Sequence, residues 1–161
     1  NRIGLSADEI ETVCQSAMMH DIGKIGCHTN LNKPGQLTEK EYAIFRLHPG
    51  YGKEILEPFT FLHPLVPGVH LHHERWDGQG YPLGIEGEQI PLIARILTVA
   101  DAYDAMTSDR AYRRAMPHEI AMAEVGRCAK AHFDPQCVDA FEKGIAEFRQ
   151  EKLDSGQKVP E

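Results

Sequence analysis

The sequence predicts an all-α fold of one domain, and three observations lead to this prediction. Apolar residues recur at helical spacing in several segments, and no segment alternates convincingly with the period of two that marks a strand. Two capping boxes, Ser6 to Glu9 and Thr38 to Glu41, mark the starts of helices. Prolines open the later helices. A chain of 161 residues is long enough to bury one hydrophobic core.

The first three helices are predicted before residue 58. The first follows the Ser6 capping box, and its apolar residues recur at positions 10, 13, 14, 17 and 18. The second opens at Thr38 and ends near His48-Pro49. The third spans Tyr51 to Leu56 and is stopped by Pro58.

Four further helices and one loop complete the domain. The fourth helix opens at Pro64 or Pro67 and runs to about Glu74. Residues 75–89 hold too many Gly and Pro residues for a helix, so a glycine-rich loop is expected between the fourth and fifth helices. The last three helices run from Pro91 to about Met106, from Pro117 to about His132 and from Pro135 to about Gln150. We expect residues 1–150 to form the domain and 151–161 a polar tail.

Composition excludes several classes of protein. The net charge of −7 argues against a DNA- or RNA-binding surface, and an acidic chain that binds phosphate must gather positive charge locally, from a metal or arginines. No apolar run approaches the ~20 residues needed to cross a bilayer, and no signal peptide opens the chain. We therefore expect a cytoplasmic protein without direct membrane insertion. Its four cysteines have no Cys-x-x-Cys spacing and are expected to be reduced thiols.

Ionisable residues interrupt helix faces that should be apolar. Asp21 continues the stripe of the first helix, His48 follows Ile44 and Phe45, and Asp101 shares a face with Leu97. A buried carboxylate without a partner costs several kcal/mol. One such His is more often a hydrogen-bonded core residue, but six residues from four helices predict a shared cation. The predicted metal ligands are His20, Asp21, His48, His72, His73 and Asp101.

This ligand set limits the metal and its chemistry. Nitrogen and oxygen ligands without a thiolate suit iron, manganese or nickel, and suit zinc less exclusively. Asp21 is placed to bridge two ions. Two ions about 3.5–4 Å apart polarise a phosphoryl oxygen and supply hydroxide as the nucleophile.

Two runs of residues resemble a known family. The run from His20 to Gly26 resembles the HD motif of the HD phosphohydrolase superfamily, and the run from His72 to Pro82 resembles the signature of its HD-GYP subgroup. The match continues in Lys33-Pro34-Gly35, in His48-Pro49-x-x-Gly52, and in residues 100–105 and 107–113. The resemblance implies a helical bundle with two or three divalent metal ions, often iron or manganese. It also implies hydrolysis of cyclic di-GMP to pGpG or GMP.

The resemblance also implies roles for residues outside the ligand set. Lys24 is expected beside the attacked phosphate, where with Asp21 it takes part in catalysis. Arg110 and Arg113 resemble a phosphate-binding pair. Tyr81 is expected either to stack on guanine or to contact a partner domain, and its loop either binds substrate or only closes over the bundle. Glu74 is expected to hold a ligand histidine in its tautomer.

Related domains usually carry a further His, sometimes with a Glu, on an earlier helix. We expect that helix to lie before Asn1. A different class of function therefore stays open: a catalytically weak regulatory module that binds a cyclic dinucleotide or a diguanylate cyclase (GGDEF-type) domain. An enzyme for a mononucleotide or an alarmone is disfavoured by Gly80-Tyr81-Pro82. The other expected partners are an upstream sensor or receiver domain and a second copy of the chain.

Overall fold

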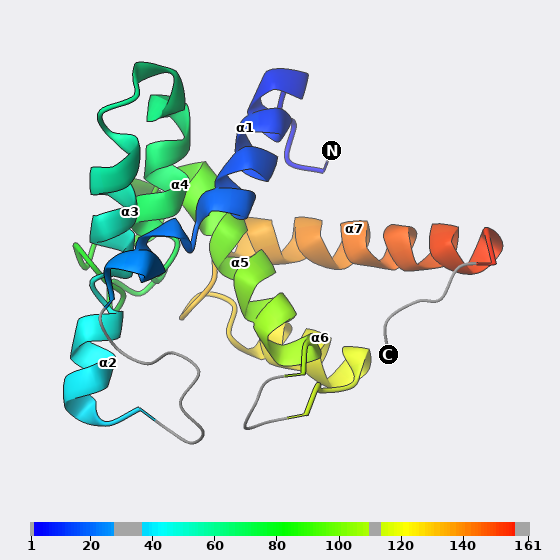
Figure 1. Cartoon of the computed structure of the whole chain (residues 1–161). Helices are drawn as coiled ribbons and strands as arrows, with labels where there is room; N and C mark the ends of the chain where they lie inside the picture. The colour runs from blue at the N-terminus through cyan, green and yellow to red at the C-terminus, as the bar shows by residue number, and fades with distance from the viewer. Residues whose placement is uncertain (1, 28–36, 110–113, 157–161) are drawn as a thin grey trace.

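The structure is a computed structural model, and it is all-helical as predicted (Figure 1). It describes residues 2–27, 37–109 and 114–156. Within these ranges there is no strand, only an isolated bridge between Ala129 and Phe133, and no helix is long and apolar enough to cross a membrane. The helices are α1 (Ala7–Met19), η1 (Ile22–Gly26), α2 (Glu39–Phe45), α3 (His48–Leu56), η2 (Thr60–Leu65), α4 (Val66–Leu71), η3 (Gly87–Gln89), α5 (Leu92–Thr107), α6 (His118–Arg127) and α7 (Pro135–Asp154), the η elements being short 3-10 helices.

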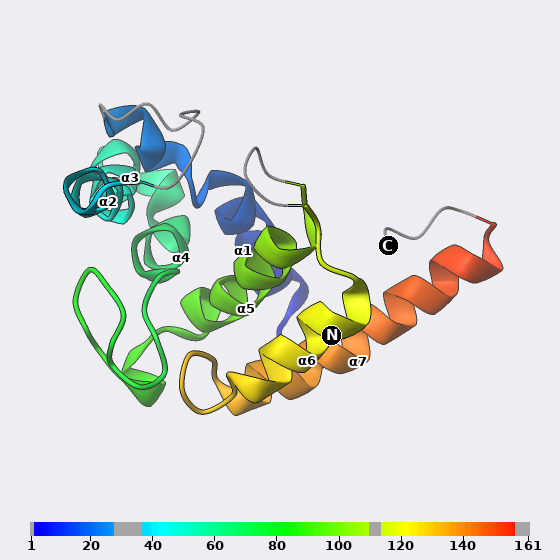
Figure 2. The same cartoon turned by 90° about the horizontal axis from the view of Figure 1, so that it is seen from below.

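Helix α5 is the central element of the fold. It contacts α1 and α4 on one side and α6 and α7 on the other (Figures 1 and 2). Helix α3 packs against η1 and α4. The C-terminal half of α7 extends away from the rest of the molecule, as both views show. The arrangement brings the C-terminal ends of α1 and α4, the N-terminal end of α3 and the middle of α5 to one region.

In the described residues, the buried apolar side chains form three clusters. The largest joins α5, α6 and α7 and contains Val99, Val125, Phe133, Cys137 and Val138. The smaller two contain Leu56, Leu65 and Val69, and Leu71, Ile90 and Ala94. Arg95 also ties α5 to the start of α7 through a 2.5 Å hydrogen bond to the buried Asp134. These clusters fix the helices that carry the predicted metal ligands.

Several helix boundaries differ from those predicted. Helix α2 ends at Phe45, and His48-Pro49 begins α3 instead of ending α2. Proline is well placed in a first turn, because its missing N–H has no partner there in any case. Helix α4 ends at Leu71 and not at Glu74. Helix α6 ends at Arg127, shortly before Lys130 adopts a left-handed φ of 69°, and α7 continues to Asp154. The domain boundary at residue 150 stays a prediction.

The predicted buried face of α1 was wrong. Ile10 is 39% exposed and Met18 is 77% exposed, whereas Ser16 is fully buried. A Cβ added to Gly68 of α4 would lie only 2.9 Å from the Ser16 Cβ, so the two helices meet through small side chains. Close approach of the backbones, and not the apolar stripe, therefore decides which face of α1 is buried.

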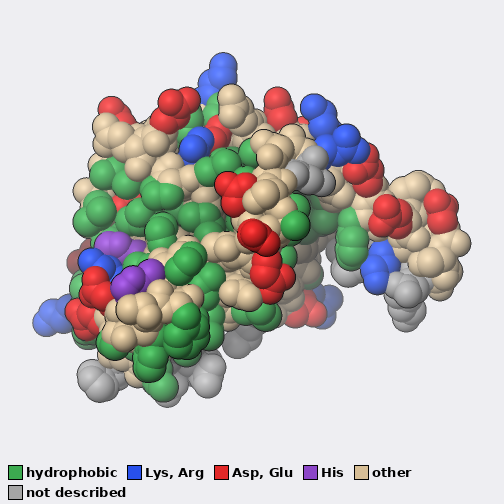
Figure 3. Space-filling view, turned by 90° about the horizontal axis from the view of Figure 1, so that it is seen from above, with side chains coloured by type: hydrophobic (Ala, Val, Ile, Leu, Met, Phe, Trp, Pro, Cys, Tyr) green, Lys and Arg blue, Asp and Glu red, His purple; other side chains and the backbone are tan. Residues whose placement is uncertain are grey.

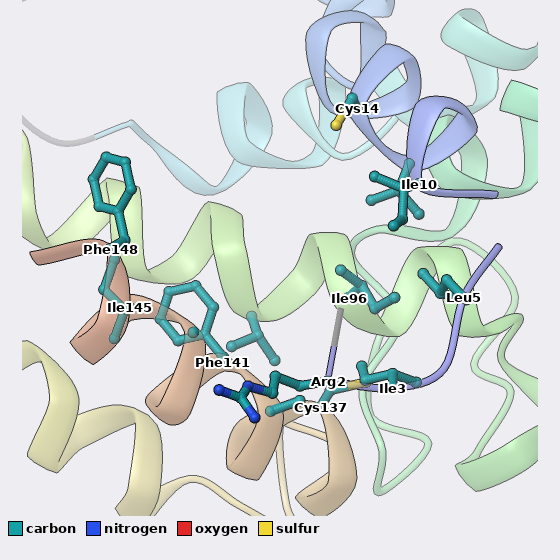
Figure 4. A pocket seen from close by; sticks show the side chains of 14 residues that line it. Arg2, Ile3, Leu5, Ile10, Cys14, Ile96, Cys137, Phe141, Ile145 and Phe148 are labelled. Atoms are coloured by element: carbon teal, nitrogen blue, oxygen red, sulfur yellow. The ribbon is translucent and has the colours of Figure 1, made fainter. Parts of the chain in front are cut away.

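The described residues enclose an apolar groove of about 420 Å³ (Figure 4). It lies between the N-terminal segment, α1, α5 and α7, and Ile10, Cys14, Ile96, Phe141 and Phe148 are among the residues that line it. None of the six predicted metal ligands is among its lining residues. The groove is therefore a separate feature from the candidate site.

Candidate metal centre

Three of the predicted histidine ligands are oriented in the same way. Each Nδ1 lies within hydrogen-bond distance of the carbonyl oxygen three residues earlier. A carbonyl oxygen only accepts, so each Nδ1 carries a proton, and in a neutral ring the Nε2 keeps its lone pair. This backbone bond fixes both ring and tautomer, as is usual for a histidine that binds a metal. The pairs are His20 with Ala17 at 2.6 Å, His48 with Phe45 at 2.8 Å and His72 with Val69 at 2.8 Å.

Asp21 lies between two of these imidazoles. Its Oδ2 is 3.3 Å from the Nε2 of His20, and its Oδ1 is 3.5 Å from the Nε2 of His48. The Nε2 of His20 is also 3.6 Å from Oδ1 of Asp101. Each oxygen of Asp21 thus faces a different histidine, which is the arrangement required of a carboxylate that bridges two ions.

His72 and His73 complete the cluster. The ring centroids of these two residues are 4.1 Å apart, and those of His48 and His73 are 5.0 Å apart. Two groups, His48–His72–His73 and His20–Asp21–His72, each have ligand atoms that all lie within 4.8 Å of one another. The structure therefore brings five of the six residues that the sequence singled out into two overlapping sets that share His72. The sixth, Asp101, lies beside them, with its Oδ1 3.6 Å from the Nε2 of His20.

The donor atoms of this cluster fit divalent cations. The Nε2 atoms of His48 and His72 are 3.3 Å apart, and both side chains are buried. Because each Nδ1 carries the proton, two lone pairs face each other, and this contact becomes favourable when a cation lies between them. The other donors are the imidazole nitrogens of His20 and His73 and the carboxylate oxygens of Asp21 and Asp101. Imidazole with carboxylate suits iron, manganese, nickel or zinc.

The protonation states favour metal binding at all but one position. Burial lowers the pKa of His48 and His73 and lowers the pKa of His72 to about 4, so these three rings are neutral. For Asp21, burial acts to raise the pKa, but hydrogen bonds from His20 and Lys24 outweigh it and hold the pKa below its usual range. Hydrogen bonds to Asp101 and Asp21 raise the pKa of His20 to about 10. Without metal, the His20 ring therefore carries a second proton, on Nε2, and is positively charged.

Metal uptake is accordingly expected to release a proton near neutral pH. The raised pKa of His20, about 10, means that this ring is charged at pH 7 and must lose its proton to bind an ion. Proton competition falls as the pH rises toward that value, so the apparent affinity for Mn²⁺ should increase, by up to about ten-fold per pH unit. Titration calorimetry in two buffers of different ionisation enthalpy measures the release. Equal heats in both buffers would contradict this assignment.

Lys24 extends the centre with a positive charge. Its Nζ donates a hydrogen bond to Oδ2 of Asp21 and lies 5.2 Å from the centroid of the Phe45 ring. Gly23 makes this placement possible, because a Cβ there would lie 1.9 Å from the carbonyl oxygen of His48 and 2.4 Å from the nitrogen of Gly52. The close contact of η1 with α3 thus holds Asp21 and Lys24 against His48.

The glycine-rich loop is anchored by Glu74. This residue is only 1% exposed, and its carboxylate accepts hydrogen bonds from the backbone N–H of Leu83 at 2.6 Å and of Gly84 at 3.1 Å. Gly80 allows the loop to fold back, since a Cβ there would lie 2.5 Å from the Cα of Glu74. Glu74 therefore holds the loop and does not orient a ligand histidine, so that prediction was wrong.

Tyr81 lies on the candidate metal centre itself. Its ring stacks on His73 with centroids 4.7 Å apart and an angle of 23°, and the guanidinium carbon of Arg46 lies 4.4 Å from the same ring centroid. Burial raises the pKa of the Tyr81 hydroxyl. A guanine base that stacked on the Arg46 side of this ring would have to displace the guanidinium. Arg46 was not predicted from the sequence, and its place two residues before His48 was the available signal.

Two predicted features lie outside the described residues. One is the arginine pair Arg110 and Arg113, and the other is the Lys33-Pro34-Gly35 motif. Helix α5, which carries Asp101, ends at Thr107, shortly before the arginines.

On the face drawn in Figure 3, the visible histidine surface is confined to one small area beside acidic and basic side chains.

Known proteins share these motifs and this fold. A family model for the HD domain matches residues 1–137. A probable cyclic di-GMP phosphodiesterase of Vibrio cholerae is 43% identical over 146 residues, which cover 85% of this chain and 33% of that protein. The cyclic di-GMP phosphodiesterase response regulator RpfG of Xanthomonas campestris is 42% identical over 154 residues, covering 92% of this chain and 40% of RpfG.

A solved structure shows a similar fold. The cyclic GMP-AMP specific phosphodiesterase of V. cholerae superposes with a TM-score of 0.70 at 22% identity, covering 93% of this chain and 41% of that one. At this identity the likeness concerns the fold alone. The chain thus spans about a third to two fifths of the length of these three proteins. The family match and the two relatives show that the chain belongs to the HD domain family and, within it, to the HD-GYP group.

Proposed function

We propose that the chain is a metal-dependent phosphodiesterase that hydrolyses a cyclic dinucleotide, cyclic di-GMP, to pGpG or GMP. The observation that carries this proposal is the position of Asp21, whose two oxygens face His20 and His48 at 3.3 and 3.5 Å. When bound, two divalent ions would polarise a phosphoryl oxygen and supply hydroxide. We propose iron or manganese, with nickel or zinc as alternatives and a third ion as an option, held by His20, Asp21, His48, His72, His73 and Asp101.

The remaining residues would act on the charge of the phosphate. Lys24 donates to Asp21 and is placed to stabilise negative charge that develops on the phosphoryl or leaving oxygen. His48 and His72 are buried, which would exclude bulk water from that side of the centre, and His73 is half-buried. Arg110 and Arg113 stay proposed phosphate contacts, and Tyr81 a proposed contact of the substrate or of a partner domain.

The substrate class and partners extend this proposal. The two relatives are named for cyclic di-GMP and the solved structure for cyclic GMP-AMP, which supports a cyclic dinucleotide as the class. RpfG is named a response regulator, which supports an upstream receiver or sensor domain for this chain as well. A cytoplasmic location, a diguanylate cyclase domain as partner and a homodimer belong to the same proposal.

The test is hydrolysis by the protein prepared free of metal and then reconstituted. Mn²⁺ or Fe²⁺, added without oxygen, should produce turnover of cyclic di-GMP that a chelator removes. Cyclic GMP-AMP in parallel reports the preference between substrates. Binding of the dinucleotide without turnover in the fully reconstituted protein would instead identify a regulatory module, and the proposed activity would be rejected.

A further inference from the structure

Arg46 is an exposed cation held against the metal centre by an aromatic ring. It caps the C-terminal end of α2, and its backbone N–H bonds to the carbonyl oxygens of Tyr42 and Ile44. Its guanidinium carbon lies 4.4 Å from the centroid of Tyr81, whose ring stacks on His73 at 4.7 Å. The guanidinium is therefore only two ring contacts away from a predicted metal ligand.

The guanidinium of Arg46 has no opposing charge in the described part of the chain. No ion pair joins it to a carboxylate there, and its side-chain partner is the ring of Tyr81. Lys24, in contrast, is already hydrogen-bonded to Asp21. Arg46 is thus a cation at the edge of the centre whose hydrogen-bond donors are available to an anion.

We propose that Arg46 binds the second phosphodiester of the cyclic dinucleotide, the one that is not attacked. This inference rests on the proposed function. A cyclic dinucleotide carries two phosphodiester anions, and the metal centre neutralises only the one that reacts. A planar guanidinium donates two parallel hydrogen bonds to a phosphate, which is a stronger contact than its position over a ring.

The position of Arg46 favours this role over a purely structural one. Its side chain is exposed, so it covers no core that would need it. The stack from Arg46 through Tyr81 to His73 limits the directions in which the guanidinium points, and a preoriented cation loses less entropy when it binds. A second described cation, Lys24, lies nearby: its Nζ is 5.2 Å from the ring centroid of Phe45, the residue that precedes Arg46 in the sequence.

The experiment compares Arg46→Gln and Arg46→Lys with the wild-type protein, all reconstituted with Mn²⁺. Arg46→Gln should raise KM for cyclic di-GMP about ten-fold with kcat nearly unchanged, and Arg46→Lys should recover part of the loss. The difference in KM between Arg46→Gln and wild type should become smaller at high salt, because screening weakens a charge contact at an exposed site. Metal content should equal that of wild type. Arg127→Gln, an exposed arginine paired with Glu124 on α6, is the matched control and should leave KM unchanged.

Two further measurements separate this role from its alternatives. In a Tyr81→Leu background, Arg46→Gln should still raise KM, whereas no additional effect would mean that Arg46 acts only by holding Tyr81. Arg46→Gln should weaken the binding of cyclic di-AMP and of cyclic di-GMP equally. A loss of binding confined to guanine-containing substrates would overturn the phosphate assignment.

Equilibrium dialysis separates the failure of this inference from the failure of the proposed function. If the wild-type protein binds the dinucleotide without hydrolysing it, the proposed phosphodiesterase function is rejected. Arg46→Gln must then still raise the Kd for the dinucleotide about ten-fold over wild type. An unchanged Kd and KM in Arg46→Gln would reject the role of Arg46 while leaving the proposed function intact.

Discussion

Asp21→Ala is expected to abolish turnover and to remove at least one of two bound metal ions. The carboxylate of Asp21 faces His20 with one oxygen and His48 with the other. Without this shared anion, two cations would face each other at short range with strong Coulomb repulsion. Elemental analysis and a hydrolysis assay on the same preparation measure both effects.

Asp104→Ala is the control for this variant. Asp104 is an exposed carboxylate on α5, three residues after Asp101, and its side chain accepts a hydrogen bond from Ser108. It should keep full metal content and full activity. An Asp21→Ala protein with two equivalents of metal and normal turnover would disprove the bridging role.

Gly23→Ala is expected to lower turnover about 100-fold or more, because a displacement near 1 Å in a reacting centre has an effect of that size. The added Cβ would lie 1.9 Å from the carbonyl oxygen of His48, so η1 and α3 must move apart. This movement separates Asp21 and Lys24 from His48. The variant should also lose about 1–3 kcal/mol of stability in urea unfolding, as overpacked sites usually do.

Gly50→Ala provides the matched comparison. Gly50 lies on α3, two residues after His48, and a Cβ there meets nothing within 4 Å. Alanine also has a higher helix propensity than glycine, so this variant should be at least as stable as wild type and fully active. If both variants behave alike, the contact between η1 and α3 does not position the centre.

The clustering of these six residues could be predicted from the sequence because ionisable side chains stand out against apolar helix patterns, whereas their role as metal ligands stays a prediction. His48, His72 and Asp101 fall within or directly after such patterns, and the structure brings them together with the other three. Asp21 lies in the cluster as predicted, but not as a continuation of a buried face of α1. The face of α1 that was expected to be buried is exposed at Ile10 and Met18, yet Asp21 reaches the centre because the chain leaves the helix just before it.

The features that the sequence did not reveal depend on contacts between distant segments. The roles of Glu74 and Arg46 depend on where the glycine-rich loop folds back, and the spacing of residues does not encode this. Glu74 binds amides nine and ten residues later, and Arg46 meets a tyrosine from a different loop. The close contact of Ser16 with Gly68 likewise joins two helices through small side chains that carry no apolar signal.

The most direct test of a two-ion centre is anomalous diffraction from crystals of the protein reconstituted with Mn²⁺. The account predicts two anomalous peaks about 3.5–4 Å apart, with Asp21 between them and the histidine Nε2 atoms toward them. One peak should lie toward His20 and Asp101, and the other toward His48, His72 and His73. A single peak, or none within reach of Asp21 at full metal occupancy in solution, would contradict the account.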